Sequence, residues 1–247
     1  MTSGSRTPRA VFLDAGLTLI YPDPPPERVY AEAFAASGLD AQEDEVRRAL
    51  HATWREVNER QARGEERWGG AGGEVGFWRL FVAGMYARLG GGELPPEVLT
   101  GLVAHFGEDE SWRVYDDVFP TLAALREKGV RLVVVSNWDS TLPGLLERLA
   151  LSSSFDAVLV SAVFGASKPS PRLFHEALRL AGVEAEEAIH VGDSFDDDVV
   201  GARAAGIRAF LLDRKGKNRG AGLRSGSGAR DEVETLESLS ELLALFP

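Results

Sequence analysis

The chain has 247 residues, 44% of them hydrophobic and 26% charged, and a net charge of -11 at pH 7. This composition is typical of a globular protein, and the negative charge argues against general binding to nucleic acid or to an anionic membrane. The absence of cysteine excludes disulfides and thiol chemistry. No apolar run approaches the roughly 20 residues that span a bilayer, and residues 1–9 lack the apolar stretch of a signal peptide. These features predict a cytoplasmic protein.

The first predicted strand covers residues 10–13 and ends on Asp14. Its four apolar residues are typical of a strand that is buried on both faces of a parallel sheet. Open α/β sheets bind ligands outside the carboxyl ends of their strands. Asp14 is therefore the first candidate for chemistry.

A proline-rich stretch at residues 21–26 ends regular structure, and the chain then has helical spacing as far as residue 112. Strand-like alternation is absent there, so we predict an all-helical insert, residues 21–113, that acts as a cap over the strand ends. Four of the five tryptophans fall in or beside this insert, and most are expected in its core. The helices are predicted at residues 27–37, 43–63, 75–89 and 97–107.

From residue 116 onward, apolar strands alternate with helices. This alternation is typical of βαβ units with right-handed crossovers. We therefore predict an α/β fold, a doubly wound (Rossmann-like) parallel sheet of five strands, formed by residues 9–20 and 114–247. After the first strand, the others are predicted at 130–135, 155–160, 188–191 and 208–212, and the helices at 120–128, 142–149, 172–181, 199–205 and 236–245.

Polar side chains follow three of these strands: Asp14, then Ser136 with Asn137, then Asp193, while Lys168 lies in a loop between the last two. Two converging aspartates repel each other and usually need a cation, and hard oxygen ligands suit Mg²⁺. Hydroxyl, amide and ammonium groups are what the other oxygens of a phosphoryl group require, and an aspartate can attack phosphorus to form an aspartyl-phosphate. Each residue alone fits a cap, a turn or a solvated loop. Their combination indicates phosphoryl chemistry.

The pattern resembles the haloacid dehalogenase superfamily of hydrolases over nearly the whole chain. A helical insert between the first two motifs resembles the family's type 1 cap, and residues 112–148 and 190–213 are most similar to the subfamily named for a rhythmically expressed gene product. The family's four motifs match, in chain order, residues 14–18 (Asp-x-x-x-Thr), Ser136 with Asn137, Lys168 with Pro169, and residues 192–198 (Gly-Asp-x-x-x-x-Asp).

The resemblance implies the strand order 3-2-1-4-5 and the Mg²⁺-dependent hydrolysis of a small phosphorylated metabolite. It implies that Asp14 is nucleophile and metal ligand, with the carbonyl of Gly16 and the side chain of Asp193 as further ligands. The other roles that it implies are phosphate binding by Ser136 and Asn137, charge compensation by Lys168, and support of these groups by Thr18 and Asp198.

One position departs from the family's phosphatases, which carry an aspartate two residues after the nucleophile where this chain has Gly16. That aspartate acts as acid and base, a contribution of about 10²–10⁴ in rate. Three functions stay open: a weak phosphatase, a metal- and phosphate-binding protein without turnover, and a 2-haloacid dehalogenase-type hydrolase. The family's dehalogenases act without a metal, and a site without a metal gains nothing from Asp193. This residue therefore argues against the dehalogenase. The family's phosphonate hydrolases form a Schiff base with a lysine of the cap. None of the four lysines of this chain lies in the insert, so this function is excluded.

Other candidates for the missing acid are few. Asp23 and Asp139 lie close to the motifs, although both fit a turn or a cap. His190 falls within a predicted strand and is interpreted as a packing or capping residue. Residues 214–230 carry six basic side chains and no acid, and their glycines and serines predict a solvated loop.

Overall fold

The computed structural model describes residues 7–68, 70–216 and 233–246. The chain divides into two compact units, one formed by Met1–Tyr21 with Val114–Pro247 and the other by Pro22–Arg113. We call the first the core unit and the second the helical unit, and each is described by itself.

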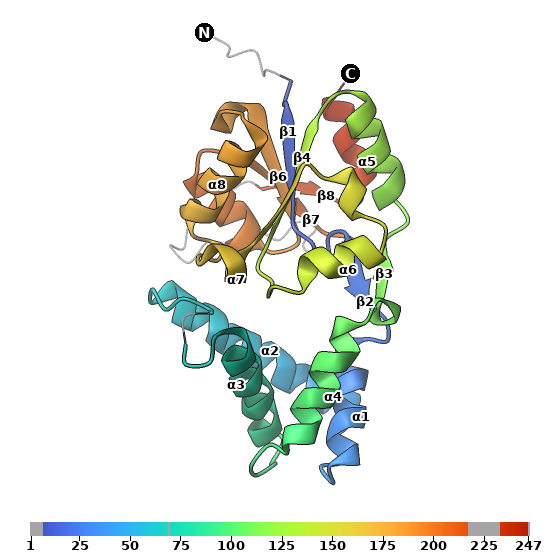
Figure 1. The fold of residues 1–247 in the computed structure, drawn as a ribbon, viewed down its shortest axis with the longest axis vertical. Helices are drawn as coiled ribbons and strands as arrows, with labels where there is room; N and C mark the ends of the chain where they lie inside the picture. The colour runs from blue at the N-terminus through green and yellow to red at the C-terminus, as the bar shows by residue number, and fades with distance from the viewer. Residues whose placement is uncertain (1–6, 69, 217–232, 247) are drawn as a thin grey trace. The chain divides into compact units, whose positions relative to one another are not determined.

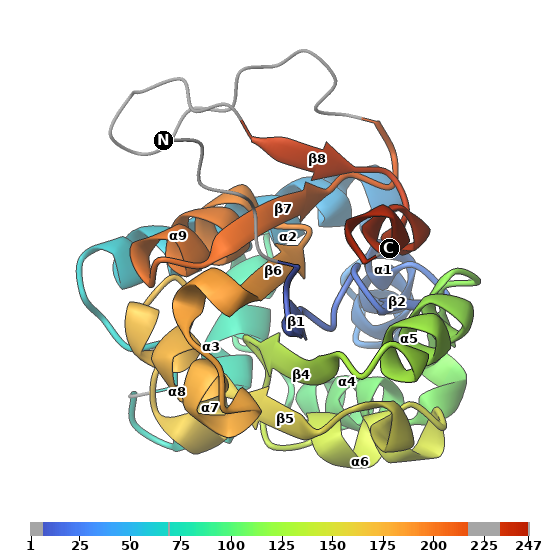
Figure 2. The same cartoon turned by 90° about the horizontal axis from the view of Figure 1, so that it is seen from above.

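The core unit is built on one parallel sheet with the strand order β5-β4-β1-β6-β7-β8. The predicted order is confirmed for five strands, but the predicted number is wrong, because a sixth strand extends the sheet beside β7. Figures 1 and 2 show β1 between β4 and β6. The strands are β1 (Ala10–Leu13), β4 (Arg131–Ser136), β5 (Ala157–Val160), β6 (Ala188–Gly192), β7 (Arg208–Leu212) and β8 (Glu234–Leu236).

Helices cover both faces of this sheet. Figure 2 shows α8 and α9 on one face and α5 and η5 on the other. Every residue of β1 and β6 is buried, which explains their continuous apolar character. The helical segments are α5 (Val118–Glu127), α6 (Leu142–Arg148), η2 (Ser152–Ser154), α7 (Ser161–Phe164), α8 (Pro171–Ala181), η3 (Ala185–Glu187), η4 (Phe195–Val200), α9 (Gly201–Ala204) and η5 (Leu239–Leu245).

Two predicted helices of the core unit differ in the structure. The helix expected at 199–205 begins earlier, as the π-helical turn η4, because Ser194 Oγ accepts a hydrogen bond from the Asp197 amide at 3.2 Å. The helix expected at 236–245 is instead the end of β8 followed by the 3₁₀ helix η5. Asp117 starts η5 by accepting hydrogen bonds from Ser238 Oγ and from the Leu239 amide, at 2.7 and 2.8 Å.

The helical unit contains α1 (Pro26–Ala36), α2 (Glu43–Ala62), α3 (Gly73–Arg88), α4 (Pro96–Gly107) and η1 (Asp109–Ser111). Its buried core includes Phe34, Phe81 and Met85, and Trp54 and Trp78 pack against it. The prediction that the insert lacks strands is wrong at its ends. The short strands β2 (Ile20–Pro22) and β3 (Trp112–Val114) pair in a two-stranded sheet. Among the described residues, no helix is both long and apolar enough to cross a bilayer.

The basic segment at 214–230 lies mostly outside the described residues, which stop at 216 and resume at 233. The prediction of a solvated loop is wrong for Arg214. Its guanidinium donates to both carboxylate oxygens of Asp117, each at 2.9 Å, and lies 3.8 Å from the centre of the Tyr115 ring. This side chain is only 14% exposed, and its ion pair with Asp117 joins two segments of the core unit.

Candidate active site

Asp14 follows β1, where the chain turns sharply. The amide of Asp14 still donates to Val191 of β6, at 3.0 Å, so the end of the sheet fixes its backbone. Leu17 then adopts a left-handed conformation with φ of 57° and donates its amide to the Ile20 carbonyl at 2.7 Å. A left-handed conformation is uncommon for a residue with a side chain. The strained residue lies three positions from the candidate nucleophile, as is frequent at functional sites.

Two side chains from other elements bind the same oxygen of Asp14. Ser136, the last residue of β4, donates its hydroxyl to Asp14 Oδ1 at 2.9 Å. Lys168, in the loop between α7 and α8, donates from Nζ to the same oxygen at 2.6 Å. Lys168 is only 2% exposed, so this charge-assisted bond is shielded from water. The structure thus brings together the three residues predicted from separate motifs.

Asp198 holds Lys168 from the opposite side. Its Oδ1 accepts Lys168 Nζ at 2.6 Å, and its Oδ2 accepts the Ser194 amide at 3.0 Å. The carboxylate lies against the backbone of Gly192, where an added Cβ would come within 2.1 Å of Asp198 Cγ. The glycine of the fourth motif is therefore required by this close approach.

Asn137 clamps the loop that carries Lys168. Its Oδ1 accepts the Lys168 amide at 2.7 Å, and its Nδ2 donates to the Lys168 carbonyl at 2.9 Å. The same Nδ2 also lies 3.3 Å from Asp197 Oδ2. The prediction that Asn137 binds phosphate stays a prediction, whereas its contact with the lysine loop is a feature that the sequence did not indicate.

Three carboxylates share this site with one buried ammonium group. Oxygens of Asp14, Asp193 and Asp198 all lie within 4.8 Å of one another. Burial and the neighbouring charges of Asp14 and Asp198 hold the pKa of Asp193 well above its ordinary value. Burial also raises the pKa of Asp14, which Lys168 only partly offsets. For Asp198 the balance is reversed, since Lys168 and His190 outweigh burial and lower its pKa.

This donor set fits a divalent cation. Carboxylate oxygens are the ligands that Mg²⁺ prefers, and a cation there would neutralise charge that Lys168 alone leaves uncompensated. The carboxylates that could hold it are those of Asp14, Asp193 and Asp198.

Comparisons with known proteins identify the family of this chain. The sequence model of the family of haloacid dehalogenase-like hydrolases matches residues 8–206. The chain belongs to this family. It is 45% identical over 111 residues to the human haloacid dehalogenase-like hydrolase domain-containing protein 3, in an alignment that covers 45% of this chain and 44% of that protein. It is 36% identical over 137 residues to a glyceraldehyde 3-phosphate phosphatase of Methanopyrus kandleri, covering 53% and 56%.

The alignments thus span about half the length of these two relatives. Among solved structures, a haloacid dehalogenase-like phosphatase from Thermococcus onnurineus has a TM-score of 0.61 and 25% identity, over 96% of this chain and 97% of that one. Dehalogenases of the family share the fold as well. The choice between the two reactions therefore rests on the site.

In this family member, Gly16 lies beside the ring of Trp138. A Cβ added at Gly16 would lie 3.3 Å from Trp138 Cζ3, so a larger residue requires the ring to shift by a few tenths of an ångström. Trp138, the residue after Asn137, is partly buried. Glycine at this position thus removes the acid and also makes room for an aromatic wall, which the sequence did not indicate.

Thr18 lies entirely buried below the turn, and its carbonyl accepts a hydrogen bond from Arg214 at 2.8 Å. Its hydroxyl has no hydrogen-bond partner among the described residues. The other acids considered for the missing role have structural partners. Asp23 pairs with Arg113 at 3.3 Å, and Asp139 accepts the Thr141 amide at 3.0 Å.

His190 is the residue whose place the sequence analysis missed. It was interpreted as a packing or capping residue, yet its Nε2 lies 2.8 Å from Asp198 Oδ1. A signal was available, because a histidine within a wholly buried strand needs a hydrogen-bond partner. The identity of that partner depends on how η4 folds back on β6.

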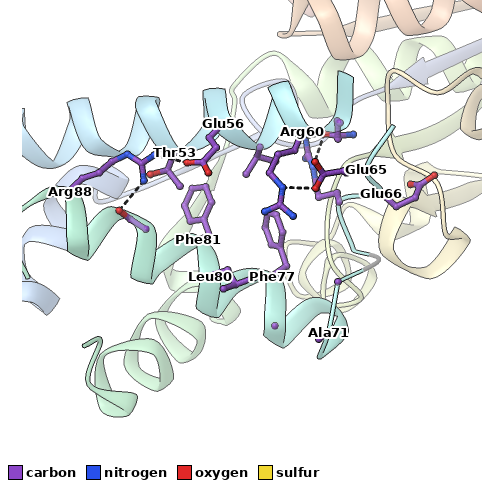
Figure 3. Close-up of a pocket in the computed structure, with 16 residues that line it drawn as sticks. Thr53, Glu56, Arg60, Glu65, Glu66, Ala71, Phe77, Leu80, Phe81 and Arg88 are labelled. Atoms are coloured by element: carbon purple, nitrogen blue, oxygen red, sulfur yellow. Dashed lines mark hydrogen bonds and ion pairs between the residues drawn. The ribbon is translucent and has the colours of Figure 1, made fainter. Parts of the chain in front are cut away.

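A separate pocket of about 260 Å³ lies within the helical unit, between α2 and α3 (Figure 3). The segment that connects α2 to α3 contributes to its lining, with Glu65, Glu66 and Arg67. Phe77 and Phe81 supply apolar surface, and Arg60 pairs with Glu65 at 2.8 Å. Because three arginines face three glutamates, the pocket offers a ligand no excess of either charge: Arg60, Arg67 and Arg88 against Glu56, Glu65 and Glu66.

An expected result follows from the raised pKa values. Mg²⁺ needs the carboxylates in their charged form, so binding releases protons and the affinity for Mg²⁺ should increase with pH until Asp193 and Asp14 are ionised. Calorimetric titration between pH 5 and pH 8 measures this change. Asp193→Asn removes one ligand and should weaken binding at every pH, whereas the exposed control Asp44→Asn should not. An affinity that is independent of pH would contradict the assignment.

Proposed function

We propose that this protein is a Mg²⁺-dependent phosphoryl hydrolase that acts on a small phosphorylated metabolite through an aspartyl-phosphate on Asp14. The observation that carries the proposal is the buried Asp14 carboxylate, held by Ser136 and Lys168 beside two further carboxylates. The similarity to a protein named as a glyceraldehyde 3-phosphate phosphatase supports the same class of substrate.

The magnesium ion would be held by Asp14, the Gly16 carbonyl and Asp193. When bound, it supplies positive charge to the phosphoryl group and offsets the repulsion between that group and the carboxylates. Ser136 and Lys168 orient Asp14 through Oδ1, and Lys168 places its ammonium group where negative charge collects.

In the first step, a carboxylate oxygen of Asp14 forms a bond to phosphorus as the bond from phosphorus to the leaving oxygen breaks. The electron pair of that bond stays on the leaving oxygen. In the second step, water attacks phosphorus as the bond from phosphorus to the Asp14 oxygen breaks; inorganic phosphate leaves with the protons of the water, and the Asp14 carboxylate is regenerated. Because Gly16 has no side chain to donate a proton, the leaving group departs as an anion. Substrates whose leaving groups are weakly basic are therefore favoured.

Gly16 also supports a second candidate, a protein that binds metal and phosphate without turnover. Gly16 leaves no acid at the position beside Trp138. A protein that binds metal and phosphate without catalysing hydrolysis would have the same arrangement of residues. Dehalogenation is the third candidate, and the partly buried Asp193 beside Asp14 and Asp198 argues against it, since displacement of halide needs no metal.

The discriminating experiment compares aryl phosphates of graded leaving-group basicity, with and without Mg²⁺. The wild type should require Mg²⁺, and its kcat/KM should fall steeply as the leaving group becomes more basic. Gly16→Asp should flatten this dependence and raise the rate on the most basic leaving group by about 10²-fold. Gly16→Asn, of the same size but unable to donate a proton, is the matched control for the shift that it forces on Trp138.

Each candidate has its own outcome. An inert wild type that gains activity in Gly16→Asp and still binds Mg²⁺ supports the protein without turnover. Halide release from a 2-haloacid in the absence of metal supports the dehalogenase. A slope that is unchanged in Gly16→Asp contradicts the role assigned to the missing acid.

A further inference from the structure

We propose that His190 is a positioning residue for the lysine of this site: by donating a hydrogen bond to Asp198, it holds Asp198 in the place from which Asp198 holds Lys168 on Asp14. The inference rests on the proposed function for its kinetic consequences. It concerns a residue outside the four motifs and a contact that links β6 to η4.

The contacts form one continuous chain. His190 Nε2 lies 2.8 Å from Asp198 Oδ1, and the same oxygen accepts Lys168 Nζ at 2.6 Å. Lys168 Nζ then reaches Asp14 Oδ1 at 2.6 Å. His190 is wholly buried and Asp198 is 1% exposed. Since water does not compete inside this cluster, the geometry of each link depends on the others.

The environment of the ring selects one tautomer. Nδ1 of His190 has no hydrogen-bond partner in the part of the chain that the structure describes, and the ring packs edge-on against Phe174, with 5.0 Å between ring centres. Along the sheet its neighbours in register are Phe12 and Ala209. A neutral imidazole has one N–H, and the carboxylate at Nε2 can only accept. The proton is therefore on Nε2 and is donated to Asp198.

Asp198 lies within the π-helical turn η4 (Phe195–Val200), and the turn itself supplies few donors to its side chain. Its other oxygen accepts only the Ser194 amide among the bonds described, at 3.0 Å. With His190 removed, the carboxylate can rotate about its last bond, and Lys168 loses a fixed partner on the side away from Asp14. A strand residue chosen only for packing would be apolar, like its neighbours Ile189 and Val191.

Two substitutions separate positioning from packing. His190→Leu fills the space but has no donor, whereas His190→Gln carries an amide N–H at about the distance of Nε2 along the side chain. With Mg²⁺ saturating and an aryl phosphate as substrate, His190→Leu should lower kcat by about 10- to 100-fold with KM changed less than about twofold. His190→Gln should recover most of kcat. His175→Gln, at an exposed position of α8, is the matched control and should leave both constants unchanged.

A second readout does not depend on activity. Nitrogen-15 NMR of the wild type should show one histidine as the Nε2–H tautomer in slow exchange with water, and this signal should disappear in His190→Leu. The ammonium signal of Lys168 should be observable in the wild type and in His190→Gln. In His190→Leu it should shift or be lost through faster exchange. Melting temperatures of all variants show whether the fold is retained.

The outcomes are distinct. A His190→Leu variant as fast as the wild type, a His190→Gln variant as impaired as His190→Leu, or an Nδ1–H tautomer overturns the proposal. A wild type that hydrolyses no phosphate ester removes the proposed function instead. In that case an unchanged Lys168 ammonium signal in His190→Leu still overturns the positioning role, and a changed signal supports it.

Discussion

Replacement of Asp14 by Asn is expected to abolish turnover while the protein stays folded. The amide cannot form the acyl phosphate, so kcat should fall by about 10⁴-fold or more. The substitution also removes the Asp14 carboxylate from a cluster of three, and burial raises the pKa of Asp14, so its charged form is disfavoured there. The metal-free variant should therefore melt at a temperature no lower than that of the wild type, since an active site can reduce the stability of its fold.

Steady-state kinetics and calorimetric melting test both parts of this prediction. Asp44→Asn, which changes an exposed carboxylate in the helical unit, should leave activity and melting unchanged. An Asp14→Asn variant that retains a tenth of wild-type activity would show that another group carries the phosphoryl transfer. A large fall in its melting temperature would show that the carboxylate stabilises the fold rather than straining it.

Lys168→Met is expected to affect stability and activity together. Lys168 is 2% exposed and bonded to both Asp14 and Asp198, so its loss leaves buried carboxylates without their cation. Breaking a buried pair in this way typically costs about 3–5 kcal/mol of unfolding free energy. Activity should fall as well, because Asp14 loses the group that holds its Oδ1.

The stability of Lys168→Met should depend on pH in a defined direction. Burial already raises the folded-state pKa of Asp14 above its ordinary value of 3.8, and without the ammonium group it rises further, while Asp198 loses the main cause that lowers its pKa. The folded state then binds more protons, so the unfolding free energy of the variant increases as pH falls through the raised values. Urea unfolding between pH 5 and pH 8 measures this. Lys128→Met, at an exposed position, is the control, and equal losses in both variants at all pH values would contradict the prediction.

Most of the core sheet could be predicted from the sequence, because each buried strand is recognised from the residues of that strand alone. Apolar runs that end on Asp14, Ser136 and Asp193 mark buried strands, and short connections with helical spacing require parallel neighbours. The sixth strand was not predictable in the same way. Only three residues of β8 pair with β7, and Asp117, more than a hundred residues away, starts the 3₁₀ helix that follows.

The sequence by itself determined which groups carry the candidate chemistry: Asp14, Ser136, Lys168 and Asp193 come from motifs whose spacing is local. Only the tertiary structure decided how these groups are held. The bond from His190 to Asp198 and the clamp of Asn137 on the lysine loop join residues that different elements bring together. The same is true of the space that Gly16 leaves for Trp138. The physical reason is that a strand's burial follows from its own residues, whereas the partner of a buried polar group depends on which loop folds against it.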